Sequence, residues 1–213
     1  NTFIRTFVHL FTKPEVVIEG YLQGIRRKYL NPISYIGIAL TLSGIIVFLM
    51  ARSIDFMQFD VFDTGAQTVY QEKLMGFILD YQALIFLVYI PLMAISGWLC
   101  FDEKKYNFAE RMIIFMYALA HFSLFIFIPS VLLLLIIPEH YITFSLIASL
   151  SMIVYSTYVI IRISGSKGKA LIGRLFVFYV ILFILYLFTS VLIPVIMLLT
   201  GEVTLQDFVP PQN

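Results

Sequence analysis

The chain has 213 residues, of which 61% are hydrophobic and only 13% are charged, whereas soluble proteins average about 45 to 50% apolar and about 25% charged residues. A soluble globule of this composition could not cover its surface with polar groups, and the residue usage of disordered or collagen-like chains is missing. The 14 Lys and Arg nearly balance the 13 Asp and Glu, so no nucleic-acid partner is expected. The composition predicts an integral membrane protein.

The first 31 residues predict a cytoplasmic segment of two short amphipathic helices. The first helix carries an apolar stripe at helical spacing, made of Phe3, Ile4, Phe7, Val8 and Phe11. The run from Thr12 to Glu15 is typical of a capping box with a first-turn proline, so a second helix is expected to begin there. Its apolar face contains Val17, Ile18, Tyr21, Leu22 and Ile25. Short amphipathic helices beside a span lie in the plane of the membrane interface.

A candidate contact site lies at the end of this segment. Three consecutive basic residues stand just before the first span, where each one adds about 1 kcal/mol of attraction to anionic headgroups. Two glycines spaced four apart allow another helix to approach closely, and Asn31 with Pro32 suits the start of the first span. We expect lipid-headgroup or partner contacts at Gly20, Gly24, Arg26, Arg27, Lys28, Tyr29 and Asn31. The alternative is that the basic residues only set the orientation of the chain.

Five stretches without Asp, Glu, Lys or Arg predict five transmembrane helices. They cover residues 33–51, 81–101, 112–137, 141–161 and 175–199, and each has about the 17 to 25 residues that cross a bilayer. None alternates apolar and polar residues as a transmembrane β-barrel strand does. The predicted fold is an all-α integral membrane protein with an interfacial segment (1–31), a five-helix domain (32–199) and an external tail (200–213).

The connections between these stretches set the predicted orientation. Twelve of the Lys and Arg lie in the segments predicted on the same side of the membrane as the N-terminus, and two lie on the opposite side. Because positive residues stay in the cytoplasm, the N-terminus is expected inside and the C-terminus outside. No cleavable signal peptide is visible, so the first span also serves as the targeting signal. Since the chain begins at Asn1, we expect that further residues precede it in the native protein.

His121 is the intramembrane polar candidate, because it lies near the middle of the third span. A charge at mid-bilayer costs about 2.5 to 3.5 kcal/mol even on the lenient scale, so ionisable residues there often indicate transport or catalysis. A neutral histidine can equally form one hydrogen bond to a neighbouring helix, and without a second ligand we favour this structural role. Three prolines inside spans are expected to kink their helices: Pro91, Pro129 and Pro194.

Other polar groups do not form a recognisable chemical site. Asp55, Asp60 and Asp63 lack the order of a calcium loop, and Glu139 with His140 is too small a set for a metal. The lone Cys100 has no partner for a disulfide or zinc motif. The basic run 165–169 lacks the strand that precedes a phosphate-binding loop. We therefore expect no catalytic residues, no cofactor and no metal, and a chain that is not an enzyme.

The N-terminal residues resemble an uncharacterised family of bacterial integral membrane proteins. The resemblance is carried by Leu10-Phe11-Thr12-Lys13-Pro14, Gly20-Tyr21, Gly24-Ile25-Arg26-Arg27-Lys28-Tyr29 and Asn31-Pro32. It implies a multi-pass protein of the bacterial cytoplasmic (inner) membrane with no known catalytic residues. Members of that family often have a short cysteine-pair zinc ribbon ahead of this region; residues 1–213 do not contain one, either because it precedes Asn1 or because the protein has none. There is a looser similarity to five-span proteins of the Yip1 type. A similarity at the level of the fold alone does not imply a function.

Two classes of function remain open at this point. We favour a non-enzymatic accessory or scaffold subunit that binds membrane lipids, other membrane protein subunits or further copies of itself. The alternative is a small transporter or channel component, in which His121 and the proline-kinked helices line a path. An ion pathway usually has more buried polar groups than one histidine, so we rank the accessory subunit above the transporter or channel.

The charge count predicts the topology. A reporter fused after Asn213 should be active only outside the cytoplasm, and one inserted in residues 165–169 should be active only inside. The check is a pair of compartment-specific reporters at both positions. A cytoplasmic C-terminus would contradict the five-span topology.

Overall fold

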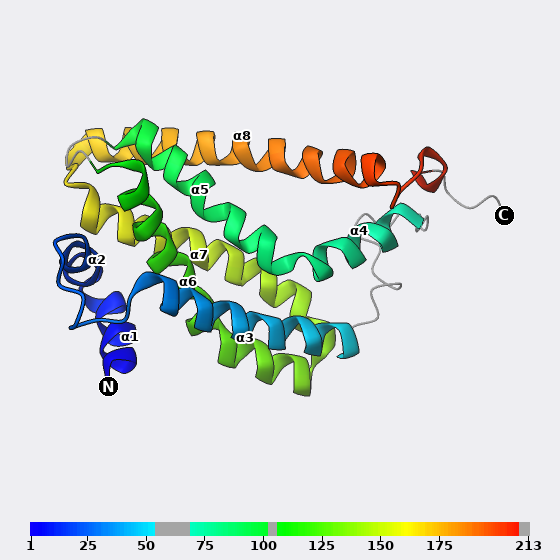
Figure 1. Cartoon of the computed structure of the whole chain (residues 1–213), viewed down its shortest axis with the longest axis horizontal. Helices are drawn as coiled ribbons and strands as arrows, with labels where there is room; N and C mark the ends of the chain where they lie inside the picture. The colour runs from blue at the N-terminus through cyan, green and yellow to red at the C-terminus, as the bar shows by residue number, and fades with distance from the viewer. Residues whose placement is uncertain (54–68, 102–105, 209–213) are drawn as a thin grey trace.

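The computed structural model describes residues 1–53, 69–101 and 106–208. These residues are helical, with no β-strand among them (Figure 1). In chain order the helices are α1 (Thr2–Thr12), α2 (Pro14–Leu22), α3 (Pro32–Ser53), α4 (Val69–Asp80), α5 (Gln82–Cys100), α6 (Phe108–Ile136), η2 (Pro138–His140), α7 (Tyr141–Ser164), α8 (Gly168–Thr200) and η3 (Leu205–Phe208).

Five of the described helices are long and apolar enough to cross a membrane, namely α3, α5, α6, α7 with the η2 turn before it, and α8. Each coincides with one of the five charge-free stretches in the sequence. The chain is therefore a multi-pass helical membrane protein. Figure 1 shows the spans running back and forth along the long axis of the molecule, with the two termini at opposite ends.

α6 is the central helix of the bundle, since it packs against α3, α5 and α7. In the most apolar stretch of α6, 39% of the residues are buried, whereas in the most apolar stretch of α8 only 6% are. α8 packs mainly on α5 and lies along one side of the bundle (Figure 1). Many exposed side chains of α8 are large and apolar, among them Phe176, Phe183 and Leu199, which suits contact with lipid chains.

The segment after Ser53 contains a helix that the sequence analysis does not predict. α4 precedes α5 and meets it at Asp80 and Tyr81, so the second span is preceded by a helical arm rather than by a simple turn. Lys73 of α4 donates a hydrogen bond to Asp207 beyond α8 at 2.8 Å, and this contact lowers the pKa of the Asp207 carboxyl. The described part of the C-terminal tail is thus tied to α4.

α6 extends well past the start of α3. The two helices run in the same direction, because Tyr35 pairs with His121 near one end while Ile46 and Leu134 share a cluster near the other. Tyr35 is the fourth residue of α3 and His121 is the fourteenth of α6. At 1.5 Å per residue, the ten-residue offset leaves about 15 Å of α6 beyond the start of α3.

α1 and α2 pack against α6 near the level where α3 begins. α1 lays its aromatic residues against His121 and Phe125, and α2 places Tyr21 edge-on against Tyr117. Figure 1 shows both short helices crosswise at the end of the bundle where α3 begins. The N-terminal segment is therefore packed on the spans.

Three details of the N-terminal segment differ from the sequence prediction. The box at Thr12 and Glu15 does not form, because Thr12 ends α1 and donates to the Val8 carbonyl at 3.2 Å. α2 starts at Pro14 as predicted but has no side-chain cap. It also ends at Leu22, so Ile25 and the basic residues lie in a loop rather than on the helix.

The two glycines do not form a helix-packing face. Gly24 lies past the end of α2 with a φ of 92°, where glycine is strongly favoured. The N–H groups of Gly24 and Ile25 bond back to the carbonyls of Tyr21 and Gly20 at 3.0 and 2.8 Å, which is a Schellman motif. No atom lies within 4 Å of a Cβ built on either glycine. Gly24 therefore ends α2 and does not share a helix face with Gly20.

The predicted start of the first span is confirmed. The Asn31 side-chain oxygen accepts a hydrogen bond from the Ser34 N–H at 2.7 Å, and Pro32 is the first residue of α3. Asn31 is therefore the N-cap of this helix.

Candidate functional site: the docked N-terminal segment

His121 lies at the centre of an aromatic cluster between α1 and the spans. Its side chain is fully buried. Its Nδ1 lies 2.8 Å from the Tyr35 hydroxyl of α3. The Phe7 and Phe11 rings of α1 meet the imidazole edge-on at 4.8 and 4.2 Å between centroids, and the Tyr155 ring lies 5.3 Å away. His121 therefore forms a hydrogen bond with a neighbouring helix, as predicted, although the sequence prediction had the histidine as donor.

The second nitrogen of His121 has no hydrogen-bond partner among the described residues. A phenol donates well and a neutral imidazole nitrogen accepts well, so we assign the Tyr35 hydroxyl as donor and Nδ1 as acceptor. The Nε2 then carries the proton, and it lies among aromatic rings whose faces are weak acceptors. The arrangement suits a neutral histidine that joins α3, α6 and α1.

The carbonyls at the end of α1 are satisfied by tyrosines from a distant span. The last carbonyls of any helix lack partners within it. The Tyr155 hydroxyl of α7 donates to the Leu10 carbonyl at 3.2 Å, and the Tyr158 hydroxyl donates to the Phe11 carbonyl at 2.9 Å. α7 therefore holds the end of α1 through two hydrogen bonds to its backbone.

The loop between α2 and α3 is anchored at its end. The Leu30 N–H donates to the Thr6 hydroxyl at 2.9 Å, and the Tyr117 hydroxyl donates to the Leu30 carbonyl at 2.6 Å. The Tyr29 ring is buried, and its hydroxyl lies 2.8 Å from the His9 Nδ1. Both backbone polar groups of Leu30 are thus bonded to side chains of α1 and α6.

The two carboxylates of α2 bond to α7 and to the connection between α5 and α6. Arg162 of α7 binds Glu15 with both Nε, at 2.9 Å, and Nη2. These hydrogen bonds lower the pKa of the Glu15 carboxyl, so any stability that the pair contributes is present above the carboxyl's unfolded pKa and is lost as the pH falls through the folded one. Glu19 accepts a hydrogen bond from the Tyr106 hydroxyl at 3.1 Å, and burial raises the pKa of that phenol.

The three basic residues form an exposed loop between these anchors. Arg26, Arg27 and Lys28 are all exposed. Arg26 lies over the Tyr21 ring at 5.9 Å, and Lys28 lies over the Tyr29 ring at 5.5 Å. We call residues 26–28 the basic loop.

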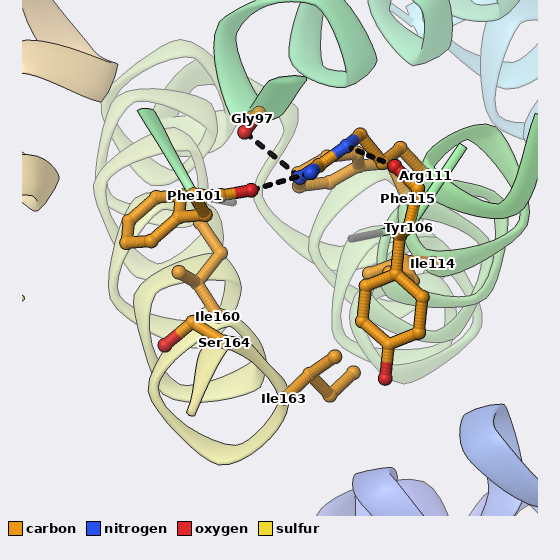
Figure 2. A pocket seen from close by; sticks show the side chains of 9 residues that line it. All are labelled: Gly97, Phe101, Tyr106, Arg111, Ile114, Phe115, Ile160, Ile163 and Ser164. Carbon is orange, nitrogen blue, oxygen red and sulfur yellow. Dashed lines mark hydrogen bonds between the residues drawn. The ribbon is translucent and has the colours of Figure 1, made fainter. Parts of the chain in front are cut away.

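Arg111 occupies a second polar position at the same end of the bundle, and it is 4% exposed. Figure 2 shows its guanidinium pointing at the backbone oxygens that end α5: Nη1 donates to Gly97 at 2.9 Å, Nη2 to Phe101, and Nε donates to Tyr106 at 3.0 Å. The hollow beside it has a volume of about 30 Å³, enough for one or two waters. A positive group at a helix C-terminus is stabilising, so the geometry supports a structural role.

The remaining candidates do not come together as a site. Within residues 1–53, 69–101 and 106–208, no three His, Cys, Asp or Glu side chains are grouped as a metal site requires. The Glu139 carboxylate lies 3.6 Å from the His140 Nδ1, and Cys100 is buried at the end of α5. Asp55, Asp60 and Asp63 lie outside the described residues.

Most of the side chains that hold the N-terminal segment could not be predicted from the sequence. They include the hydroxyls of tyrosines 117, 155 and 158 and the pairing of Glu15 with Arg162. The only signal was the presence of polar-tipped aromatic residues in otherwise apolar spans. Such residues are also common at membrane interfaces without a partner.

Comparison with known proteins gives one partial match. A sequence model of a family described as "Protein of unknown function (DUF3667)" matches residues 1–44. This region contains α1, α2, the basic loop and the start of α3. The match is consistent with the expected resemblance to an uncharacterised family. No curated protein and no solved structure matches the chain.

The Tyr35 and His121 contact predicts a measurable coupling. Tyr35→Phe leaves the buried Nδ1 without a donor and should lower the free energy of unfolding by about 1 to 3 kcal/mol, and His121→Leu should cost on the order of 1 kcal/mol. The double variant should cost less than the sum, with a coupling of about 0.5 to 1.5 kcal/mol, in a double-mutant cycle by unfolding in mixed micelles. His121→Gln, which keeps a hydrogen-bonding group, should stay close to wild type.

The control pairs His121→Leu with Tyr89→Phe, because Tyr89 lies on α5 and stacks on Tyr186 of α8. That pair should be additive within about 0.5 kcal/mol. Additive costs for Tyr35 and His121 as well would show that the contact adds nothing to stability.

Proposed function

We propose that this chain is a non-enzymatic accessory or scaffold subunit of the bacterial cytoplasmic membrane, which binds partner membrane proteins or lipids through its N-terminal segment. The observation that carries the proposal is that this segment is tied to α3, α6 and α7 while its basic loop stays exposed. A surface held in place before binding loses little conformational freedom when a partner arrives.

The loop is fixed on both sides. Before it stands the Schellman motif of Gly24, and after it both polar groups of Leu30 are bonded. Three cations are therefore presented from a defined backbone, which favours recognition of a negatively charged surface. The proposed inside location of the N-terminus agrees with this, because the cytoplasmic leaflet carries the anionic lipids.

The alternative, a small transporter or channel component, is favoured by the unpartnered Nε2 of His121 among the described residues. A buried nitrogen of this kind could exchange a proton with water in an open state. However, the side chain is fully buried and enclosed by aromatic rings. The scaffold proposal is therefore preferred.

The test of the scaffold proposal is purification of the tagged full chain in a mild detergent. We expect a partner protein or a defined lipid to be retained at a stoichiometric level by wild type, and to be reduced at least fivefold in the variant Arg26→Gln, Arg27→Gln, Lys28→Gln. The matched control removes three exposed positive charges elsewhere, with Arg5→Gln, Lys167→Gln and Lys169→Gln, and should retain the bound component.

Two results would contradict the proposal. One is that nothing is retained at a stoichiometric level by wild type. The other is a proton flux in proteoliposomes that wild type supports and His121→Gln abolishes while the variant stays folded, which would favour the transporter alternative instead.

A further inference from the structure

We propose that the basic loop, together with the exposed Ile25 before it and Ile33 after it, is a binding site for the headgroup and upper acyl chain of an anionic phospholipid. This inference rests on the proposed function and names the ligand of its binding surface.

Among the described residues, no carboxylate is paired with the cations of the loop. Between Val16 and Ser53 the only acidic residue is Glu19, which accepts a hydrogen bond from Tyr106. Within the described part of the chain, Arg26, Arg27 and Lys28 make no hydrogen bond or ion pair through their side chains. Three adjacent cations without a carboxylate partner attract an anion.

The side-chain types suit a phosphate group. The planar guanidinium of arginine can donate two parallel hydrogen bonds to phosphate oxygens, and lysine supplies a compact point charge. The rings beneath Arg26 and Lys28 limit the positions of these two cations. Arg27, between them, makes no ring contact among the described residues.

The position of the loop along the chain places it near the bilayer surface. α3 begins at Pro32, four residues after Lys28. Four extended residues span at most about 14 Å, and the headgroup layer outside the hydrocarbon core is about 5 to 8 Å thick on each side. The cations therefore lie within reach of headgroup phosphates.

Exposed apolar side chains around the loop favour a lipid over an acidic protein segment. Ile25 is 50% exposed and Ile33 is 72% exposed. On the outer face of α1, Ile4 and Val8 are exposed as well. Cations alternating with exposed aliphatic residues are typical of segments that lie at the boundary of headgroups and acyl chains.

The experiment measures lipid binding to the purified full chain in a neutral detergent. Phosphatidylglycerol and phosphatidylcholine with identical acyl chains are added separately, and bound lipid is counted by native mass spectrometry. Wild type should prefer phosphatidylglycerol. Each Gln substitution in the loop should reduce that preference about fivefold, and high salt should weaken it.

Two variants make the result specific. The control with Arg5→Gln, Lys167→Gln and Lys169→Gln should keep the preference, because its charges lie outside the loop. Ile25→Ser should weaken the binding of phosphatidylglycerol although it removes no charge. If the triple loop variant fails to fold, Arg27→Gln alone serves, since this side chain has no ring contact to lose.

Three outcomes overturn the inference. Equal binding of the two lipids would show that the loop does not select anionic headgroups. An equal loss in the control would assign the effect to overall charge. A loss in the loop variant without any effect of Ile25→Ser would favour an acidic protein segment as the occupant. Retention of a protein partner through the loop in any of these cases would leave the scaffold proposal standing.

Discussion

The structure depends on covering one face of α6 beside the start of α3. Without α1 and α2, His121 and the neighbouring aromatic residues on this face would have no helix on that side. Contact with water would be unfavourable for the apolar rings of this surface, and contact with lipid would leave its polar groups without hydrogen bonds. α1 and α2 provide a matching surface of the same kind.

The hydroxyl groups of tyrosines make this packing possible in a medium of low dielectric. A backbone carbonyl that lacks a partner away from water costs several kcal/mol. The end of α1 would leave two such groups, and Tyr155 and Tyr158 satisfy both. Tyr117 satisfies a third carbonyl at Leu30. The Tyr117 side chain is buried and those of Tyr155 and Tyr158 are partly buried against the core, so each contributes packing and hydrogen bonding together.

The spans could be predicted from the sequence because hydropathy and the absence of charge are local properties of a stretch. The N-cap at Asn31 is local as well, since its partner Ser34 is three residues away. The predicted capping box at Thr12 and Glu15 was wrong because Thr12 is the last residue of α1, and Glu15 instead pairs with Arg162, which lies 147 residues further along the chain. Gly24 was assigned to a helix face, although its positive φ ends the helix. Contacts between residues far apart in the chain depend on how the helices pack, and local patterns in a single sequence do not reveal this packing.

The most direct test of this account is hydrogen exchange of the full chain in lipid nanodiscs, resolved over residues 1–31. If α1 and α2 are docked as described, their amides should exchange as slowly as those of the C-terminal half of α7, while the amides of the basic loop exchange faster. Exchange of residues 2–22 at the rate of an unstructured peptide would contradict the docking of the N-terminal segment on which the account depends.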